Sequence, residues 1–247
     1  MLRMLKIEFQ KIKRQKFVFY TLVAACLFPI PLTVLILHTK LSYDTLFMFV
    51  MEFGFFLVLP IVLGTVATIL FRMENENGTL KMLTIIPVSR GRMVVAKIMV
   101  LLILAIFYGI MATVSTIIGG LLVGSVIGII SKIIISLGLS VLIVIAVLPI
   151  VAIVVAFHRN IILPILCAVV YAISSFVFSL TMSRFPSPLT LVFRLCLPLI
   201  SATPERLATE VGVQEWIMPF FPCVVILIGI GIVCIILSVE IYRKQEV

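Results

Sequence analysis

The longest apolar run in this chain extends from Met93 to Phe157, and Lys97 and Lys132 are its only charged residues. As one α-helix this run would be about 97 Å long, at ~1.5 Å per residue. The hydrocarbon core of a bilayer is only ~30 Å thick, so the run has to fold back on itself. Glycine and serine residues cluster at 124–132, where we expect the reversal. The sequence therefore predicts a third and a fourth membrane span at 93–123 and 133–156.

The composition extends this conclusion to the whole chain. Hydrophobic residues make up 63% of the sequence and charged residues 12%, with a mean hydropathy of +1.37. Soluble domains are only ~45–50% apolar. We therefore expect an all-α polytopic membrane protein, with residues 1–247 forming a single transmembrane domain of six helices. The remaining four spans are expected at 17–37, 45–71, 161–182 and 216–239, and Pro29 and Pro31 should kink the first.

The net charge of +9 has a topological explanation. In the six-span arrangement, about 14 of the 19 Lys and Arg residues fall on the side that holds both termini. Cytoplasmic loops carry such an excess, so the N and C termini are expected in the cytoplasm of a bacterium, with the chain in the cell membrane. The basic residues thus require no nucleic-acid partner.

Residues 1–16 have the pattern of an amphipathic helix. Leu2, Leu5, Phe9 and Ile12 recur at spacings of three and four, and the other face holds the basic residues Arg3, Lys6, Lys11, Lys13 and Arg14. Such a helix can lie at the surface of an anionic cytoplasmic leaflet before the chain enters the bilayer. Alternatively, the basic segment serves only to orient the first span.

Residues 72–92 form a long break between apolar runs, and it has the character of a docking surface. Asn77 can cap a helix that continues to Ile86 and ends at Pro87, and Ser89 can begin the next helix. A helix this short neither spans a bilayer nor is stable alone. Because it is rich in apolar residues, it must bury them against something, and we interpret 72–92 as a docking region.

This region resembles a known family of transporters. The strings at 76–81 (ENGTLK) and 87–90 (PVSR), followed by Lys97, resemble the loop between spans two and three of type-2 ATP-binding-cassette (ABC) exporter permeases. In that family the loop forms a coupling helix that sits in a cleft of the ATPase subunit. The resemblance implies six docking residues, with three apolar anchors in the cleft and three charged residues at its rim. They are Leu80, Leu83 and Ile86, and Glu76, Lys81 and Arg90. The alternative is a charged connector that lies on the lipid headgroups.

A second informative break lies at 187–212. Residues 189–200 are apolar but too few to cross a bilayer, and Arg194 interrupts them, so we expect a re-entrant or interfacial helix. Thr203 and Pro204 can start another short helix that ends at Gly212. Two short outer helices between spans five and six are also a feature of the type-2 exporter permeases.

Glu52 is the one acid expected inside the hydrocarbon region. A carboxylate there is costly unless it is neutralised or paired. Arg194, expected on the same side of the membrane, is the basic residue that could answer it, so we predict that the two meet at an extracellular gate. The alternative is that Glu52 reaches the outer interface as a bystander.

The sequence offers little that could carry bond chemistry. It contains no GxxxxGK phosphate-binding loop, and its cysteines and histidines form no metal-ligand pattern, so we expect no catalytic residue, metal or cofactor in this chain. ATP and Mg would be bound by a separate ATPase subunit. An intramembrane lipid-pyrophosphate phosphatase is the enzyme alternative, because 87–90 is similar to its PGxSRS string. Val88 and Gly91 depart from that string.

The resemblance implies a permease subunit that pairs with a second permease, either the same chain or a paralogue, and with the ABC-type ATPase. The small size and short outer loops are similar to those of permeases that protect bacteria against lantibiotics and bacitracin-like peptides. We therefore expect export of an antimicrobial peptide or a similar amphipathic substrate. A lipid-linked substrate, a drug or an ion is the alternative cargo.

Overall fold

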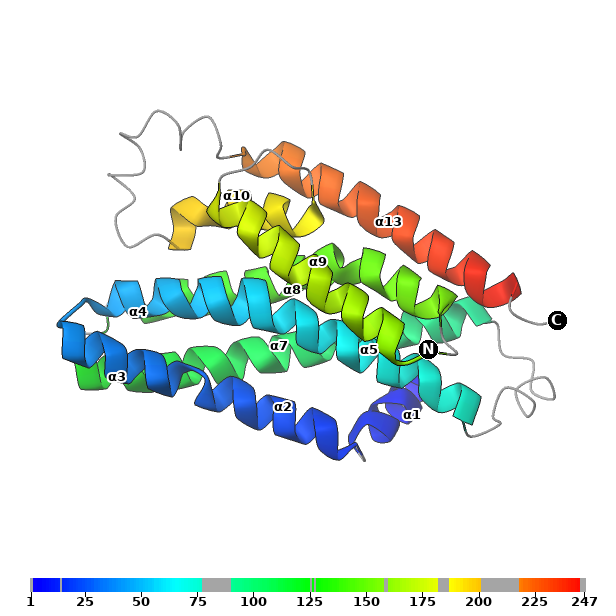
Figure 1. Cartoon of the computed structure of the whole chain (residues 1–247), viewed down its shortest axis with the longest axis horizontal. Coiled ribbons are helices and arrows are strands. Elements are labelled where there is room, and N and C mark those ends of the chain that lie inside the picture. The colour runs from blue at the N-terminus through cyan, green and yellow to red at the C-terminus, as the bar shows by residue number, and fades with distance from the viewer. Residues whose placement is uncertain are drawn as a thin grey trace.

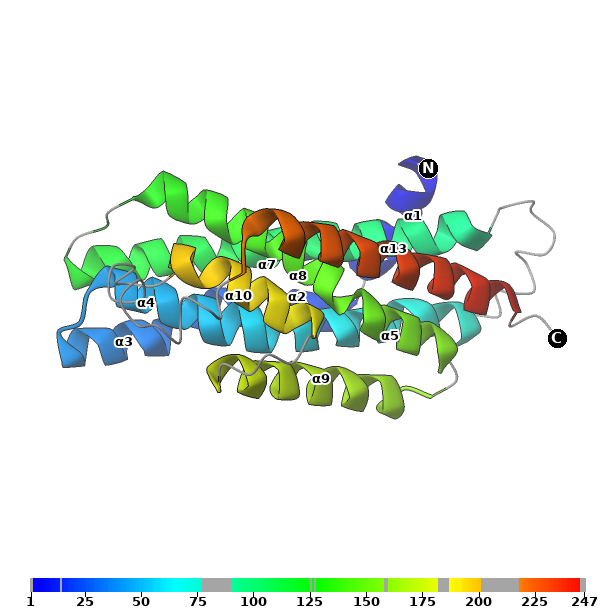
Figure 2. The ribbon, with the colours of Figure 1, turned by 90° about the horizontal axis from the view of Figure 1, so that it is seen from above.

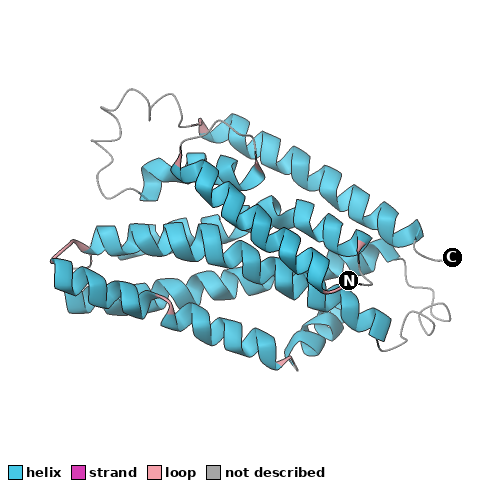
Figure 3. Ribbon diagram, in the orientation of Figure 1, coloured by secondary structure: helices cyan, strands magenta, loops and turns pink. Residues whose placement is uncertain are grey.

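A computed structural model shows a bundle of helices (Figures 1 and 3). It describes residues 2–13, 15–76, 90–124, 126, 128–157, 160–181, 187–200 and 218–244. Within these ranges every regular element is a helix and there are no strands. The elements are α1 (Leu2–Lys13), α2 (Lys16–Leu27), α3 (Pro29–Thr39), α4 (Tyr43–Phe49), η1 (Val50–Val58), α5 (Leu59–Glu76), α7 (Arg90–Val123), α8 (Ile129–Ala156), α9 (Ile162–Leu180), α10 (Pro188–Ile200) and α13 (Phe220–Lys244).

Six helical stretches are long and apolar enough to cross a membrane. They are Lys16–Thr39, Tyr43–Met73, Gly91–Val123, Ile129–Ala156, Ile162–Leu180 and Phe220–Lys244. The predicted all-helical, six-span fold is therefore confirmed. α1 and the C-terminal end of α13 lie at one end of the bundle, and the turn between α3 and α4 lies at the other (Figure 1).

α8 is the central helix of the bundle, in contact with α5, α7, α10 and α13. Its side chains Ile143, Val147, Val151 and Val155, spaced four residues apart, are almost completely buried. Residues at this spacing share one face of a helix, so α8 presents a continuous apolar stripe to its neighbours. α9 lies along one side of the bundle when it is seen from above (Figure 2).

The first span is broken into α2 and α3 at Phe28, one residue before Pro29. Pro29 is the first residue of α3. A proline is tolerated there because the first N–H groups of a helix have no intrahelical partner. The break thus follows from the proline pair whose kink the sequence indicates.

The second span contains an unusual element. Residues Val50–Val58 form the π-helix η1, between α4 and α5. Gly54 lies in η1 opposite the break in span one: a Cβ placed on it would be 3.2 Å from the Phe28 ring. The wide turn of span two and the break in span one therefore face each other.

Two glycines make the reversal between α7 and α8. Gly124 and Gly128 have φ values of 124° and 70°, in the region that side chains disfavour. The sequence placed the reversal at 124–132, but α8 already begins at Ile129, so Lys132 lies in its first turn.

α13 differs from the span expected at 216–239. It runs from Phe220 to Lys244, and residues 216 and 217 lie outside the described ranges. The helix continues past Val239 because Tyr242 is buried against Phe71 of α5, with ring centroids 6.1 Å apart. This aromatic contact gives the last helical turn a packing partner.

α10 is a short helix packed against α8, α9 and α13. Ser187 precedes it and accepts a hydrogen bond from the Thr190 backbone N–H at 3.1 Å, as an N-cap does. The buried side chains of α10 include Leu189, Val192 and Cys196. The second short helix expected, from Thr203 to Gly212, lies outside the described residues.

Candidate functional site

Four of the six predicted docking residues lie within residues 77–89, and the other two, Glu76 and Arg90, come directly before and after this segment. Glu76 is the last residue of α5 and Arg90 is the first of α7. Leu80, Lys81, Leu83 and Ile86 lie outside the described residues, as do the side chains of Glu76 and Arg90. The two helices that flank this segment, α5 and α7, are held together by contacts between their described residues.

Lys97 joins these two helices. It lies on α7 about 10 Å along the helix axis from Arg90, at ~1.5 Å per residue. Its Nζ donates a hydrogen bond of 2.6 Å to the Leu70 carbonyl oxygen of α5 and lies 4.8 Å from the centroid of the Phe71 ring. Although Lys97 carries a charged group, its exposed fraction is 0%. A fully buried ammonium is costly unless hydrogen bonds and an opposite charge compensate for its lost hydration.

The opposite charge comes from α1. A Glu8 carboxylate oxygen lies 3.6 Å from Lys97 Nζ, and the other accepts a hydrogen bond of 2.5 Å from Lys11. Glu8 is 6% exposed, and Ile12 on the same helix is buried. α1 therefore packs against α7 and contributes a carboxylate to the space between α5 and α7.

The sequence indicates no role for Glu8, and it indicates Lys97 only as a basic residue on the inner side that follows the docking strings. A usable signal was present in both helices. Glu8 lies within the apolar stripe made by Leu5, Phe9 and Ile12, and Lys97 continues a helical face with Val94 and Leu101. A charge within an apolar stripe indicates a buried partner, but sequence alone does not say which one.

The segments that carry the predicted gate residues are in contact. Glu52 belongs to η1 and Arg194 to α10, and both side chains are half-buried. The contact is made by the neighbouring aromatic residues Phe56 and Phe193, whose rings meet edge to face with centroids 4.8 Å apart. The pairing of Glu52 with Arg194 stays a prediction.

A second lysine links separate helices at the opposite end of the bundle, and we call each of these two links a lysine tie. Lys132, at the start of α8, forms an ion pair with Asp44 at the start of α4. Its Nζ also lies 3.8 Å from the centroid of the Tyr43 ring and 5.3 Å from that of Phe47. The tie joins the turn after span one to the beginning of span four.

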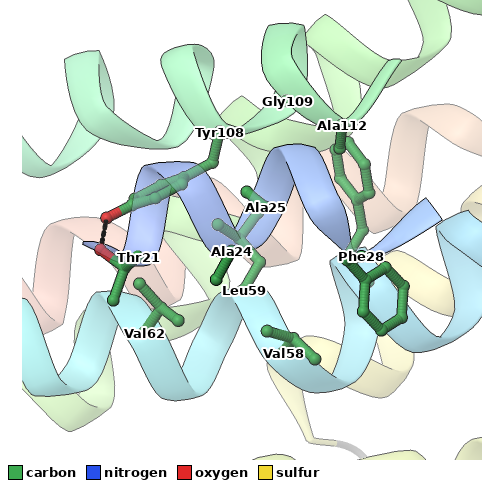
Figure 4. Close-up of a pocket in the computed structure, with 12 residues that line it drawn as sticks. Thr21, Ala24, Ala25, Phe28, Val58, Leu59, Val62, Tyr108, Gly109 and Ala112 are labelled. Carbon is green, nitrogen blue, oxygen red and sulfur yellow. Dashed lines mark hydrogen bonds between the residues drawn. The ribbon is translucent and has the colours of Figure 1, made fainter. Parts of the chain in front are cut away.

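An apolar cavity of about 140 Å³ lies between α2, η1–α5 and α7 (Figure 4). Figure 4 shows Phe28 at one end of it and a hydroxyl pair at the other, where Thr21 Oγ1 and Tyr108 OH are 2.5 Å apart. These two hydroxyls bond to each other, and alanine, valine and leucine side chains form much of the remaining lining. The cavity therefore suits an apolar group rather than an ion.

The residues that the structure describes form no candidate metal site. In these ranges, no three His, Cys, Asp or Glu side chains gather closely enough to hold a metal ion.

The six apolar helices define a multi-pass membrane protein. This chain belongs to the ABC-2 family of transporter proteins, whose family profile matches residues 4–175, from α1 into α9. It is accordingly a membrane-spanning permease subunit of an ABC transporter, a class that works with an ATP-binding subunit. A search among curated proteins finds no match.

Proposed function

We propose that this chain couples ATP hydrolysis on its partner ATPase to export of an antimicrobial peptide or similar amphipathic substrate. The ATPase docks on the region 72–92, with Leu80, Leu83 and Ile86 in its cleft and Glu76, Lys81 and Arg90 at the rim. The supporting observation is that α5 and α7, the helices on either side of this region, are joined by the buried Lys97–Leu70 hydrogen bond. Helices fixed in this way offer a rigid base for a docking segment.

Replacement of Leu83 with Asp tests this docking, because apolar anchors in desolvated pockets usually carry more binding energy than rim charges. We expect the ATPase to be lost from the purified complex and transport to stop. Leu41→Asp is the matched control, since Leu41 is exposed in the turn between α3 and α4 at the other end of the bundle. Unchanged recovery of the ATPase with Leu83→Asp would refute docking through this segment.

The active unit is a pair of permease subunits that meet through spans one and five. The apolar side chains that this pairing would cover are exposed: Phe19 and Tyr20 on α2 are each 64% exposed, and Leu166 and Val170 on α9 are 56% and 58% exposed. Cysteine crosslinking between subunits at the outer ends of α3 and α9 tests this arrangement. Crosslinks obtained solely through α7 and α8 would contradict it.

Glu52 and Arg194 form the outer gate of this exporter. If the two side chains interact, each single substitution should impair export more than the charge-swapped pair Glu52→Arg with Arg194→Glu does. The contact of η1 with α10 supports this expectation. If the Glu52→Gln variant transports as well as the unmodified protein, the Glu52 carboxylate has no role in the mechanism.

The substrate class is tested by bacterial growth. Cells that express the permease with its ATPase should tolerate a higher concentration of lantibiotic or bacitracin-like peptide than cells carrying the Leu83→Asp variant. The runner-up cargo is a lipid-linked molecule, which the apolar cavity between α2, η1–α5 and α7 favours. Equal growth of the two strains, together with accumulation of a lipid-linked precursor in the variant, would favour that cargo.

A further inference from the structure

We infer that Lys97 and Glu8 are positioning residues that transmit movement of the docking segment to the N-terminal helix α1. This inference rests on the proposed docking of the ATPase on the region 72–92. By this inference, α1 moves in addition to the docking segment.

The first step of the argument is the position of Lys97. Residues 77–89 connect α5 to α7, and Lys97 Nζ bonds the Leu70 carbonyl of α5 from within α7. The bond lies about 9 Å from Glu76 along α5 and about 10 Å from Arg90 along α7, at ~1.5 Å per residue. A displacement of the docking segment therefore reaches both helices at a point where they are joined, and it moves them together.

The second step is the link to α1. Glu8 lies 3.6 Å from Lys97 Nζ, and both side chains are almost completely withdrawn from solvent. Separating the two groups would move a buried ammonium and a buried carboxylate away from each other, which is unfavourable where water cannot replace the lost attraction. α1 therefore follows α7 when α7 moves.

The third step is the orientation of α1. Its buried face includes Glu8 and Ile12, whereas Ile7 on another face is 54% exposed. In a membrane protein, an exposed apolar side chain on a short helix at the end of the bundle contacts lipid or the membrane interface. Tilting of α1 would thus shift apolar side chains relative to the interface each time the ATPase moves the docking segment.

The experiment measures this movement directly. Spin labels are placed at Ile7 on α1 and at Phe157, which is 48% exposed at the end of α8, in a background without the five native cysteines. The permease is purified with its ATPase, reconstituted in lipid, and the distance between labels is compared without nucleotide and with a hydrolysis-resistant ATP analogue. We expect a nucleotide-dependent shift in the unmodified pair.

Two variants separate transmission from simple structural support. Glu8→Gln keeps the side-chain size and the Lys97–Leu70 bond but removes the charge that α1 supplies. Lys97→Met removes both links. The ATPase should copurify with Glu8→Gln while the nucleotide-dependent shift is lost, and Lys97→Met should lose the shift as well. Lys97→Arg, which keeps the positive charge and the hydrogen-bond donors, should retain the shift.

Arg243→Gln is the matched control, because it breaks an ion pair with Glu240 that lies at the same end of the bundle on the exposed side of α13. Its shift should equal that of the unmodified protein. A full shift in Glu8→Gln with the ATPase bound would overturn the inference, and so would an immobile α1 in the unmodified complex. Failure of the unmodified permease to bind any ATPase would overturn the proposed function, and this inference with it.

Discussion

The two ends of the bundle each contain a lysine that pairs with a carboxylate and lies over aromatic rings, but the two ties differ in burial. The Lys97 side chain is 0% exposed and that of Glu8 is 7% exposed. At the other end, the Lys132 side chain is 12% exposed and that of Asp44 is 48% exposed. Similar groups are therefore used in two dielectric environments.

This difference decides what each tie can do. Partly exposed ion pairs contribute little, because water and salt screen them and side-chain entropy opposes them. A buried pair also gains little in net terms, but its rupture leaves an unpaired charge and is strongly penalised. The Lys132 tie can consequently open and close easily, whereas the Lys97 tie keeps α1, α5 and α7 together. The rigid end is the one that flanks the docking segment.

The largest expected effect is that of Lys97→Met on stability. Removing one partner of a buried ion pair typically costs about 3–5 kcal/mol of unfolding free energy. Glu8 keeps its bond to Lys11, so we expect the lower end of this range. Unfolding in mixed detergent and SDS micelles is the measurement. Lys132→Met is the comparison at the opposite end of the bundle, and an equal loss in both variants would remove the distinction between the ties.

A glycine substitution should weaken only the end of the bundle that contains Lys132. A Cβ on Gly120 of α7 would collide with the ring of Tyr43, against which Lys132 lies. Overpacking of this kind costs about 1–3 kcal/mol. We expect Gly120→Ala to increase hydrogen exchange at the start of α4 and α8 while the backbone around Lys97 keeps its protection. Increased exchange at both ends would show that the two ties are not independent.

The smallest effect is expected for Asp44→Asn. Because Asp44 is 48% exposed, its pair with Lys132 should contribute only about 0.2–1 kcal/mol. The loss of stability should shrink further as salt is raised from 0.05 to about 0.5 M, since ions screen exposed charges. Glu8→Gln, measured in the same series, should show almost no salt dependence. A salt-independent loss in Asp44→Asn would mean that this pair is shielded from the solvent.

The overall architecture could be predicted because it depends on quantities that are local in sequence. The apolar run from Met93 to Phe157 exceeds the thickness of a bilayer, and Gly124 and Gly128 mark the place where it reverses. The break before Pro29 also follows from local chemistry. The predicted ends of helices were less accurate where a contact between residues far apart in the sequence sets them. One example is the contact of Phe71 with Tyr242, which gives the last turn of α13 a packing partner.

The side-chain ties could not be predicted in the same way. Asp44 and Lys132 were both expected outside the membrane, but nothing in the sequence pairs two residues 88 positions apart. Lys97 was counted as a basic residue on the inner side, because the charge rule for membrane topology does not distinguish exposed from buried residues. The docking residues and the gate pair stay predictions, since a partner protein and a substrate decide them.

The π-helix η1 gives span two an adjustable length. Its hydrogen bonds close over five residues instead of four, so each turn contains more residues than a turn of α-helix. If Val50–Val58 changed from π-helix to α-helix, the same residues would occupy a greater distance along the helix axis. α5 would then move along this axis and rotate about it relative to α4. No connecting loop would have to break for this to happen. The free energy would come from exchanging one backbone hydrogen-bond pattern for another along the nine residues of η1.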